Sequence, residues 1–178
     1  MPKEKGGKKN QAETVERITE QKVLPIIERY GYELWDVIFE KEGAMWYLKV
    51  LFDKADGGID DAECEEITEP LNKAVDTLSC IDLVDVFEVG SPGLDRQLRK
   101  PFHFVKMKGE KIKVTVRDEN GKTAYYSGVL GDYDENSGEF TVQTEDGEMK
   151  FNAIMSCHLF FIKNRLYFLT FRQQSIKQ

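Results

Sequence analysis

The chain has few of the residues from which enzymes build catalytic and metal-binding sites. Its two histidines, His103 and His158, lie in separate segments, and neither has a cysteine or another histidine at metal-ligand spacing. Glycine-rich phosphate loops, dinucleotide-binding glycine patterns and nucleophile elbows are also missing. We therefore expect no catalytic residue, no metal and no cofactor, and we interpret the protein as a binding protein rather than an enzyme.

Other absences bear on where the protein works. No apolar run reaches the length of a membrane-spanning helix. The Lys- and Gly-rich start of the chain has no apolar stretch behind it of the kind found in secretory signals. The three cysteines, Cys64, Cys80 and Cys157, are odd in number and not closely paired, which favours reduced thiols. We expect a cytoplasmic protein with no membrane contact, in which residues 1–12 form a disordered basic arm.

Charge is abundant in this sequence, and it is unevenly distributed. Residues 1–97 contain 12 Lys and Arg against 22 Asp and Glu, whereas residues 98–178 contain 13 against 10. An acidic first half and a weakly basic second half indicate contacts with nucleic acid or with charged protein. The charges alone leave an alternative open, in which the acids serve solubility and the bases cover one strand face.

Residues 13–90 predict an α/β domain, because segments of helical and strand periodicity alternate. The expected elements are a helix over 13–29, strands over 35–39, 46–52 and 84–89, and a helix that begins after Asp60. Glu63 stands three residues after Asp60, the spacing of a capping box. Two helices on one face of a three-stranded sheet would bury the apolar stripes of both.

Residues 99–172 predict an all-β domain. From Ile112 the apolar period changes to two, and Asn120-Gly121 is a strong hairpin signal. The expected strands cover about 111–117, 122–132, 139–144, 148–151 and 157–162. Five short strands with tight turns indicate a small barrel, since closure of the sheet removes its exposed edges.

Basic residues gather at the start of this second domain, with seven bases and one acid over residues 99–117. Alternate residues of a strand share a face and lie about 6.6 Å apart, close to the phosphate spacing of a nucleic-acid strand. We therefore take this set as a candidate nucleic-acid site: Lys100, Lys106, Lys108, Lys111, Lys113 and Arg117. Phe102, Tyr125 and Tyr126 would offer stacking surfaces, although we expect core packing for at least two of them.

A second candidate site is the acidic start of the second helix: Asp60, Asp61, Glu63, Glu65 and Glu66. Such a cluster would dock a protein rich in Lys and Arg. The alternative is a solvated helix start, where carboxylates are favoured by the helix dipole in any case.

The segment between the domains, residues 91–98, is the most specific stretch. Pro92 and Gly93 suit a type II turn, in which Gly93 takes the positive φ. Asp95 and Arg96 then place opposite charges on a stiff backbone. The segment is interpreted as a rigid linker with a local ion pair or as a site that contacts a partner.

Ser91-Pro92-Gly93-Leu94-Asp95-Arg96, after a hydrophobic strand, resembles the signature of the ribosome maturation factor RimP family. The resemblance covers roughly residues 12 to 162 and includes three further stretches, Gly31 to Val37, Trp46 to Lys54 and Gly58 to Glu66. Four features depart from the family's pattern: Gly90 in place of Ser, Gln97 in place of Pro, Pro70 within the second helix, and the apolar tail 166–171.

The resemblance implies an α+β protein whose second domain is an Sm-like, SH3-type barrel. It implies assistance in maturation of the small (30S) ribosomal subunit, by transient binding of the immature particle. The acidic cluster would accept a basic ribosomal protein of the decoding region, and the basic set would hold ribosomal RNA. Residues 91–96 would set the angle between domains in a monomer. The alternative function is that of an Sm-like regulatory RNA-binding protein.

Overall fold

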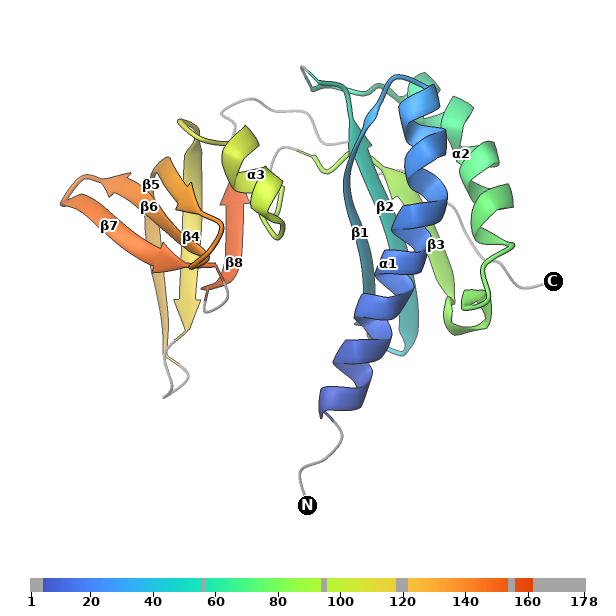
Figure 1. Ribbon diagram of the computed structural model, residues 1–178, viewed down its shortest axis with the longest axis horizontal. Coiled ribbons are helices and arrows are strands. Elements are labelled where there is room, and N and C mark those ends of the chain that lie inside the picture. The colour runs from blue at the N-terminus through green and yellow to red at the C-terminus, as the bar shows by residue number, and fades with distance from the viewer. Residues whose placement is uncertain (1–4, 56, 94–95, 118–121, 154–155, 162–178) are drawn as a thin grey trace. The chain divides into compact units, whose positions relative to one another are not determined.

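The computed structural model describes the backbone of residues 5–161, apart from residues 56, 94–95, 118–121 and 154–155 (Figure 1). The described residues form two compact units, an N-terminal unit that ends at Pro92 and a C-terminal unit that begins at Gly93. The tail 166–171 lies outside the described residues. None of the helices within these ranges is long and apolar enough to cross a membrane.

The N-terminal unit places two helices on a three-stranded sheet (Figure 1). Its elements are α1 (Lys5–Arg29), β1 (Glu33–Glu42), β2 (Met45–Asp53), α2 (Asp61–Val75), the short 3-10 helix η1 (Ile81–Leu83) and β3 (Val86–Gly90). β1 and β2 form an antiparallel hairpin, and β3 joins β2 in parallel, so that β2 is the central strand. The predicted arrangement of this half is confirmed.

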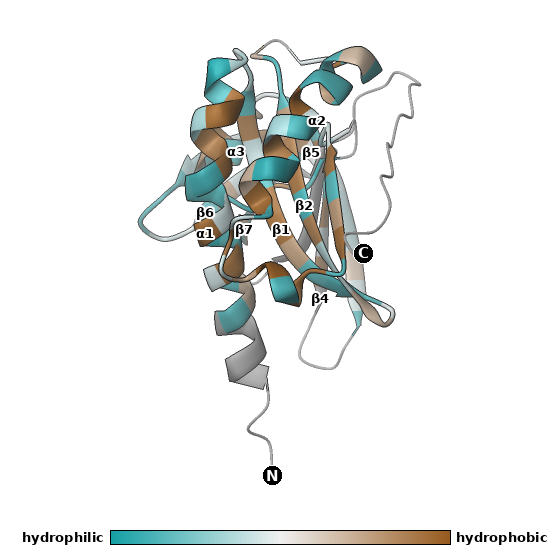
Figure 2. Cartoon of the chain, turned by 90° about the vertical axis from the view of Figure 1, so that its right-hand side faces the viewer, coloured by the Kyte–Doolittle hydropathy of each residue, from teal (hydrophilic) through white to brown (hydrophobic). Residues whose placement is uncertain are grey.

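One buried cluster joins both helices to all three strands. Ile27 of α1 and Leu71 of α2 are buried in it, together with Val37, Val50 and Val89 of the sheet. Figure 2 shows apolar residues on the strands beneath the two helices. The period-two alternation of the strands therefore meets the helical stripes of α1 and α2, as the sequence predicts.

Helix α1 begins earlier than the sequence suggests. The prediction of a disordered arm over residues 1–12 is wrong for residues 5–12, which are helical. Lys, Gln and Ala dominate residues 8–12 and favour helix, which offsets the unfavourable pair Gly6-Gly7. Pro25 and Pro70 both lie inside helices and end neither of them.

The start of α2 is confirmed as a capping box. The Glu63 N–H donates to Asp60 Oδ1 at 2.9 Å, and the Asp60 N–H donates to Glu63 Oε2 at 3.1 Å. The second Glu63 oxygen lies 2.6 Å from the Lys54 ammonium. That hydrogen bond, followed by the one from the Asp60 backbone, lowers the pKa of the Glu63 carboxyl.

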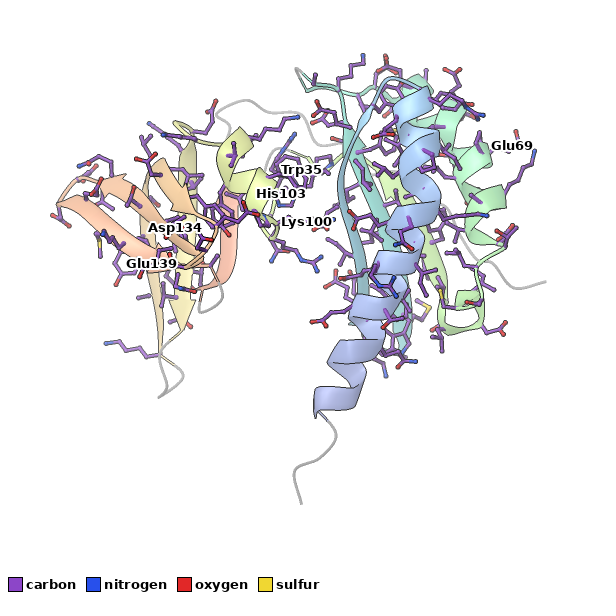
Figure 3. The ribbon with its side chains drawn as sticks, in the orientation of Figure 1. Trp35, Glu69, Lys100, His103, Asp134 and Glu139 are labelled. Carbon is purple, nitrogen blue, oxygen red and sulfur yellow. The ribbon has the colours of Figure 1, made fainter. Side chains whose placement is uncertain are left out.

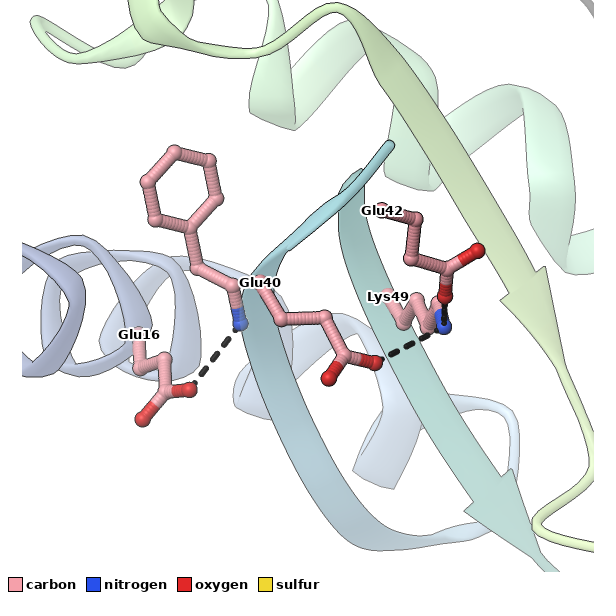
Figure 4. A network of polar contacts seen from close by, with 5 residues as sticks. Glu16, Glu40, Glu42 and Lys49 are labelled. Atoms are coloured by element: carbon pink, nitrogen blue, oxygen red, sulfur yellow. Dashed lines mark hydrogen bonds and ion pairs between the residues drawn. The ribbon is translucent and has the colours of Figure 1, made fainter. Parts of the chain in front are cut away.

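Charged side chains fix the hairpin of the sheet (Figure 4). Glu16 of α1 accepts the Phe39 N–H of β1 at 2.9 Å, which ties the helix to this edge strand. Lys49 of β2 donates to Glu40 at 2.9 Å and also pairs with Glu42. Burial lowers the pKa of Lys49, but its bonds to Glu42 and Glu40 raise it by more, so the ammonium is held protonated.

The C-terminal unit is a five-stranded antiparallel sheet with one short helix. Its elements are α3 (Pro101–Lys106), β4 (Lys111–Arg117), β5 (Thr123–Asp134), β6 (Glu139–Thr144), β7 (Gly147–Asn152) and β8 (Ser156–Phe161), with the strand order β7-β6-β5-β4-β8. Phe104 of α3 stacks on Tyr133 at 4.5 Å and meets Phe140 at 5.2 Å. The five predicted strands are present, although helix α3 is not among the predicted elements.

The prediction of a closed barrel requires one more strand pairing than the structure describes. Among the five strands of this unit, every pairing that the structure describes joins neighbours in the order above. Within the described residues the two outer strands, β7 and β8, are not paired with each other. An antiparallel sheet is therefore established for this unit. Its closure into an Sm-like or SH3-type barrel stays a prediction.

Candidate functional site

Strand β4 presents a basic face. Lys111 and Lys113 are exposed, whereas Ile112 and Val114, which alternate with them, are fully buried, so the predicted alternation is confirmed. Arg117 is the last residue of β4 and pairs with Thr123, but its side chain lies outside the described residues. The described part of this face therefore carries two lysines at alternate positions.

Tyr125 of β5 completes this face. It is 65% exposed, and the Lys113 ammonium lies 5.1 Å from its ring centroid. The register pairs Lys113 with Ser127 and Thr115 with Tyr125, so these side chains share one side of the sheet. A cation beside an exposed aromatic ring supplies the two contacts that single-stranded nucleic acid uses, with phosphate and with a base. We call Lys111, Lys113 and Tyr125 the β4–β5 face.

The other two aromatic candidates, Tyr126 and Phe102, differ in their burial. Tyr126 packs on Phe151, with ring centroids 5.1 Å apart, so it serves the core. Phe102 on α3 is 42% exposed and meets His103 edge-on at 4.3 Å. The expectation of core packing for at least two of the three is therefore wrong, because α3 turns Phe102 outward while its neighbours His103 and Phe104 are buried.

The remaining predicted bases do not belong to β4. Lys100 precedes α3 and Lys106 ends it, and both are half-buried. Lys108 follows in the turn and pairs with Asp132 of β5, which neutralises part of its charge. The structure thus divides the basic set between α3, a turn and the β4–β5 face.

His103 has a structural role, as its position between two aromatic residues suggests. It is fully buried, and its Nδ1 accepts the backbone N–H groups of Arg99 at 2.9 Å and Lys100 at 3.1 Å (Figure 3). These bonds hold the chain at the entry to α3. Among the described residues no group of three or more His, Cys, Asp or Glu side chains is placed to hold a metal ion.

The acidic cluster of α2 divides into two parts. Asp60 and Glu63 are held in the capping box, and Glu63 also pairs with Lys54. Asp61, Glu65 and Glu66 are exposed, and within the described ranges none of them forms an ion pair. These three carboxylates are the part of the cluster that is available to a partner.

The linker turn has the predicted backbone. Gly93 takes a φ of +73°, and its carbonyl accepts the Arg96 Nε–H at 3.1 Å. Burial raises the pKa of the Cys64 thiol on α2, and the carboxylates of Asp61, Asp60 and Glu63 raise it further. A hydrogen bond with the backbone of Ser91, one residue before Pro92, lowers the pKa of this thiol, but the other effects outweigh it. Leu94 and Asp95 lie outside the described residues, and so does the predicted pair of Asp95 with Arg96.

A family model described as the RimP N-terminal domain matches residues 22–95. The match runs from the middle of α1 through the whole sheet and α2, and it ends within the linker signature. These residues form a RimP N-terminal domain, which supports the RimP family for this chain. The resemblance found in the sequence is thereby confirmed over residues 22–95, and the family is one of ribosome maturation factors that act as assembly factors rather than enzymes.

The RimP match covers the N-terminal unit from residue 22 onward, whereas most of the C-terminal unit lies beyond the matched residues. The family match therefore gives no information on the β4–β5 face, which lies beyond the matched residues. Sequence reasoning overlooked helix α3, although Pro101 at its first position is a helix-start signal. It also overlooked the Lys113–Tyr125 contact, because cross-strand neighbours depend on a register that the sequence does not reveal.

Proposed function

We propose that this RimP-family protein assists maturation of the small (30S) ribosomal subunit by transient, non-covalent binding of the immature particle. The match of residues 22–95 to the RimP N-terminal domain carries this proposal, because the family consists of ribosome maturation factors. In this proposal the protein works as a monomer in the cytoplasm, and the sheet of its C-terminal unit closes into an Sm-like barrel.

The two units divide the work. The exposed carboxylates Asp61, Glu65 and Glu66 would accept a basic ribosomal protein of the decoding region, because their charge is complementary to such a surface. The β4–β5 face would hold ribosomal RNA. The linker Ser91 to Arg96 would set the angle between the units, supported by the positive φ of Gly93 and the Arg96 bond to it.

Co-sedimentation tests the proposal. The purified protein is mixed with 30S, 50S and 70S particles at low salt and separated on sucrose gradients. We expect it in the 30S fraction, with more retained on particles from cells that lack the protein than on mature ones. Equal recovery in the 50S fraction, or recovery only at the top of the gradient, would remove the proposed function.

Gly93→Val tests the linker. Nothing lies within 4 Å of the added Cβ, so the cost is backbone strain alone, on the order of 1–3 kcal/mol for a β-branched residue at positive φ. We expect both units to keep their melting transitions while association with 30S particles falls. Gly93→Asn is the matched control, because asparagine tolerates this conformation. Wild-type association of the valine variant would show that the turn does not set a required angle.

The second candidate function is an Sm-like regulatory RNA-binding protein. The Lys113–Tyr125 contact favours it, because such a face suits single-stranded RNA whether or not a ribosome is present. Retention on free RNA with none on 30S particles would favour this function over the first.

A further inference from the structure

A hollow lies between α2 and β3 of the N-terminal unit, beside the acidic carboxylates but apart from the capping box. It has a volume of about 380 Å³. Seven residues line it: Cys64, Glu65, Thr68, Glu69, Asn72, Phe87 and Val89. The five from α2 form two adjacent rows at four-residue intervals, Cys64, Thr68 and Asn72 in one and Glu65 and Glu69 in the other, so they make one stripe along the helix. The two from β3 are buried and apolar.

The position of β3 gives this hollow the form of a groove. Within the described residues β3 is an edge strand, whose one strand neighbour is β2. Its five residues span about 16 Å, and the α2 stripe from Cys64 to Asn72 spans about 12 Å. An extended peptide of four residues has a length of about 13 Å, which matches the stripe.

The rim of the groove is acidic. Glu65 and Glu69 are exposed, and Figure 3 shows Glu69 on the outer side of α2. Glu69 pairs with Lys73 at 2.7 Å, but both side chains are about three-quarters exposed. Such a pair contributes little to stability, so a cation from a partner can take the place of Lys73. Phe87 and Val89 leave an apolar floor beneath these carboxylates.

We propose that this groove binds an extended segment of a Lys- and Arg-rich protein, in which basic and apolar residues alternate. Successive side chains of an extended chain point to opposite sides, so alternate residues would reach the apolar floor while the basic ones meet Glu65 and Glu69. This inference rests on the proposed function, since it names the kind of ribosomal-protein segment that the acidic unit accepts.

The test uses the full chain and a fluorescein-labelled peptide of eight residues in which valine and lysine alternate. A second peptide has the same composition with all lysines in one block. We expect the alternating peptide to bind more tightly in fluorescence anisotropy. It should also slow the alkylation of Cys64, read by mass spectrometry, because that side chain lines the groove.

Glu65→Gln with Glu69→Gln should weaken binding of the alternating peptide roughly 2- to 30-fold, as two exposed ion pairs are lost. Glu20→Gln with Glu28→Gln, on α1, makes the same change in net charge outside the groove lining and should leave binding nearly unchanged. Asn72→Trp, which fills the groove, should abolish the preference for the alternating peptide. Melting curves check that each variant is folded.

Equal effects of the two glutamine pairs, or an unprotected Cys64, would overturn the groove as the site. Binding that appears only after deletion of residues 166–178 would also overturn it, because the chain's own end would then be the occupant. The same variants are run on gradients with 30S particles. If the wild-type protein does not bind the alternating peptide but sediments with 30S particles, this inference alone is refuted. If the wild-type protein does not sediment with 30S particles, the proposed function is refuted.

Discussion

Gly128→Val is expected to unfold the C-terminal unit and to leave the N-terminal unit folded. A Cβ at Gly128 would lie 2.3 Å from the Gln143 carbonyl oxygen, 2.7 Å from Val142 Cγ1 and 2.9 Å from the Gln143 carbonyl carbon. Two of these obstacles are backbone atoms of β6, the strand paired with β5, so they cannot rotate away. Overpacking costs about 1–3 kcal/mol where neighbours can adjust, and more here, against a total stability of about 5–15 kcal/mol.

The chain offers a spectroscopic means to see one unit unfold. Both tryptophans, Trp35 and Trp46, belong to the N-terminal unit, so their fluorescence follows that unit while far-ultraviolet circular dichroism follows both. In Gly128→Val we expect the tryptophan transition near its wild-type midpoint, with part of the dichroism already lost at low temperature. Loss of both signals together would show that the units depend on each other for folding.

Two further glycines give matched controls. Gly131 also has a close neighbour, but it is the Thr141 Oγ1 at 2.2 Å, the end of a side chain that can rotate. Gly131→Ala should therefore destabilise less than Gly128→Ala. Its cost should be about 1 kcal/mol, because rotation of Thr141 loses the hydrogen bond that its Oγ1 accepts from the Asp132 N–H. Gly90→Ala has open space and no positive φ, so it should change stability by less than about 0.5 kcal/mol.

The sequence predicted those parts of the fold that depend on neighbours along the chain. The capping box of Asp60 and Glu63 follows from their spacing, and the β1–β2 hairpin follows from alternation on both sides of Gly43. The parallel pairing of β3 with β2 was not predicted, since it joins Val86 to Tyr47 across 39 residues of chain. The need for glycine at position 128 is likewise visible only when β6 lies beside it.

The candidate sites were predicted in part for the same reason. Lys111 and Lys113 share a face because the period of a strand is two, and the structure exposes both. Glu63 was grouped with Glu65 and Glu66 by charge, yet it is held by Asp60 and Lys54. Sequence shows which residues are acidic, but it does not show which carboxylates the fold itself uses.

Replacing Lys111 and Lys113 with glutamate and Tyr125 with alanine is expected to lower the affinity for single-stranded ribosomal RNA by more than about 100-fold. Stacking of one base on an aromatic ring is worth about 1–3 kcal/mol. Loss of two phosphate contacts should also reduce the slope of log K against log salt by about 1.4. The fold should survive, because all three side chains are exposed and the Lys113–Tyr125 contact contributes only about 0.5–1 kcal/mol.

Anisotropy titrations with a labelled single-stranded fragment of small-subunit RNA, at four salt concentrations, measure both quantities. Lys22→Glu with Lys41→Glu makes the same change in net charge at exposed sites of the N-terminal unit, so it separates a specific face from a general effect of charge. If this control lowers affinity and slope as much as the triple variant, the RNA is attracted by total charge. If neither variant changes them, the β4–β5 face does not bind RNA. If only the triple variant lowers affinity and slope, Tyr125→Ala alone separates the two kinds of contact. Loss of stacking lowers the affinity without changing the salt slope, whereas loss of phosphate contacts changes both.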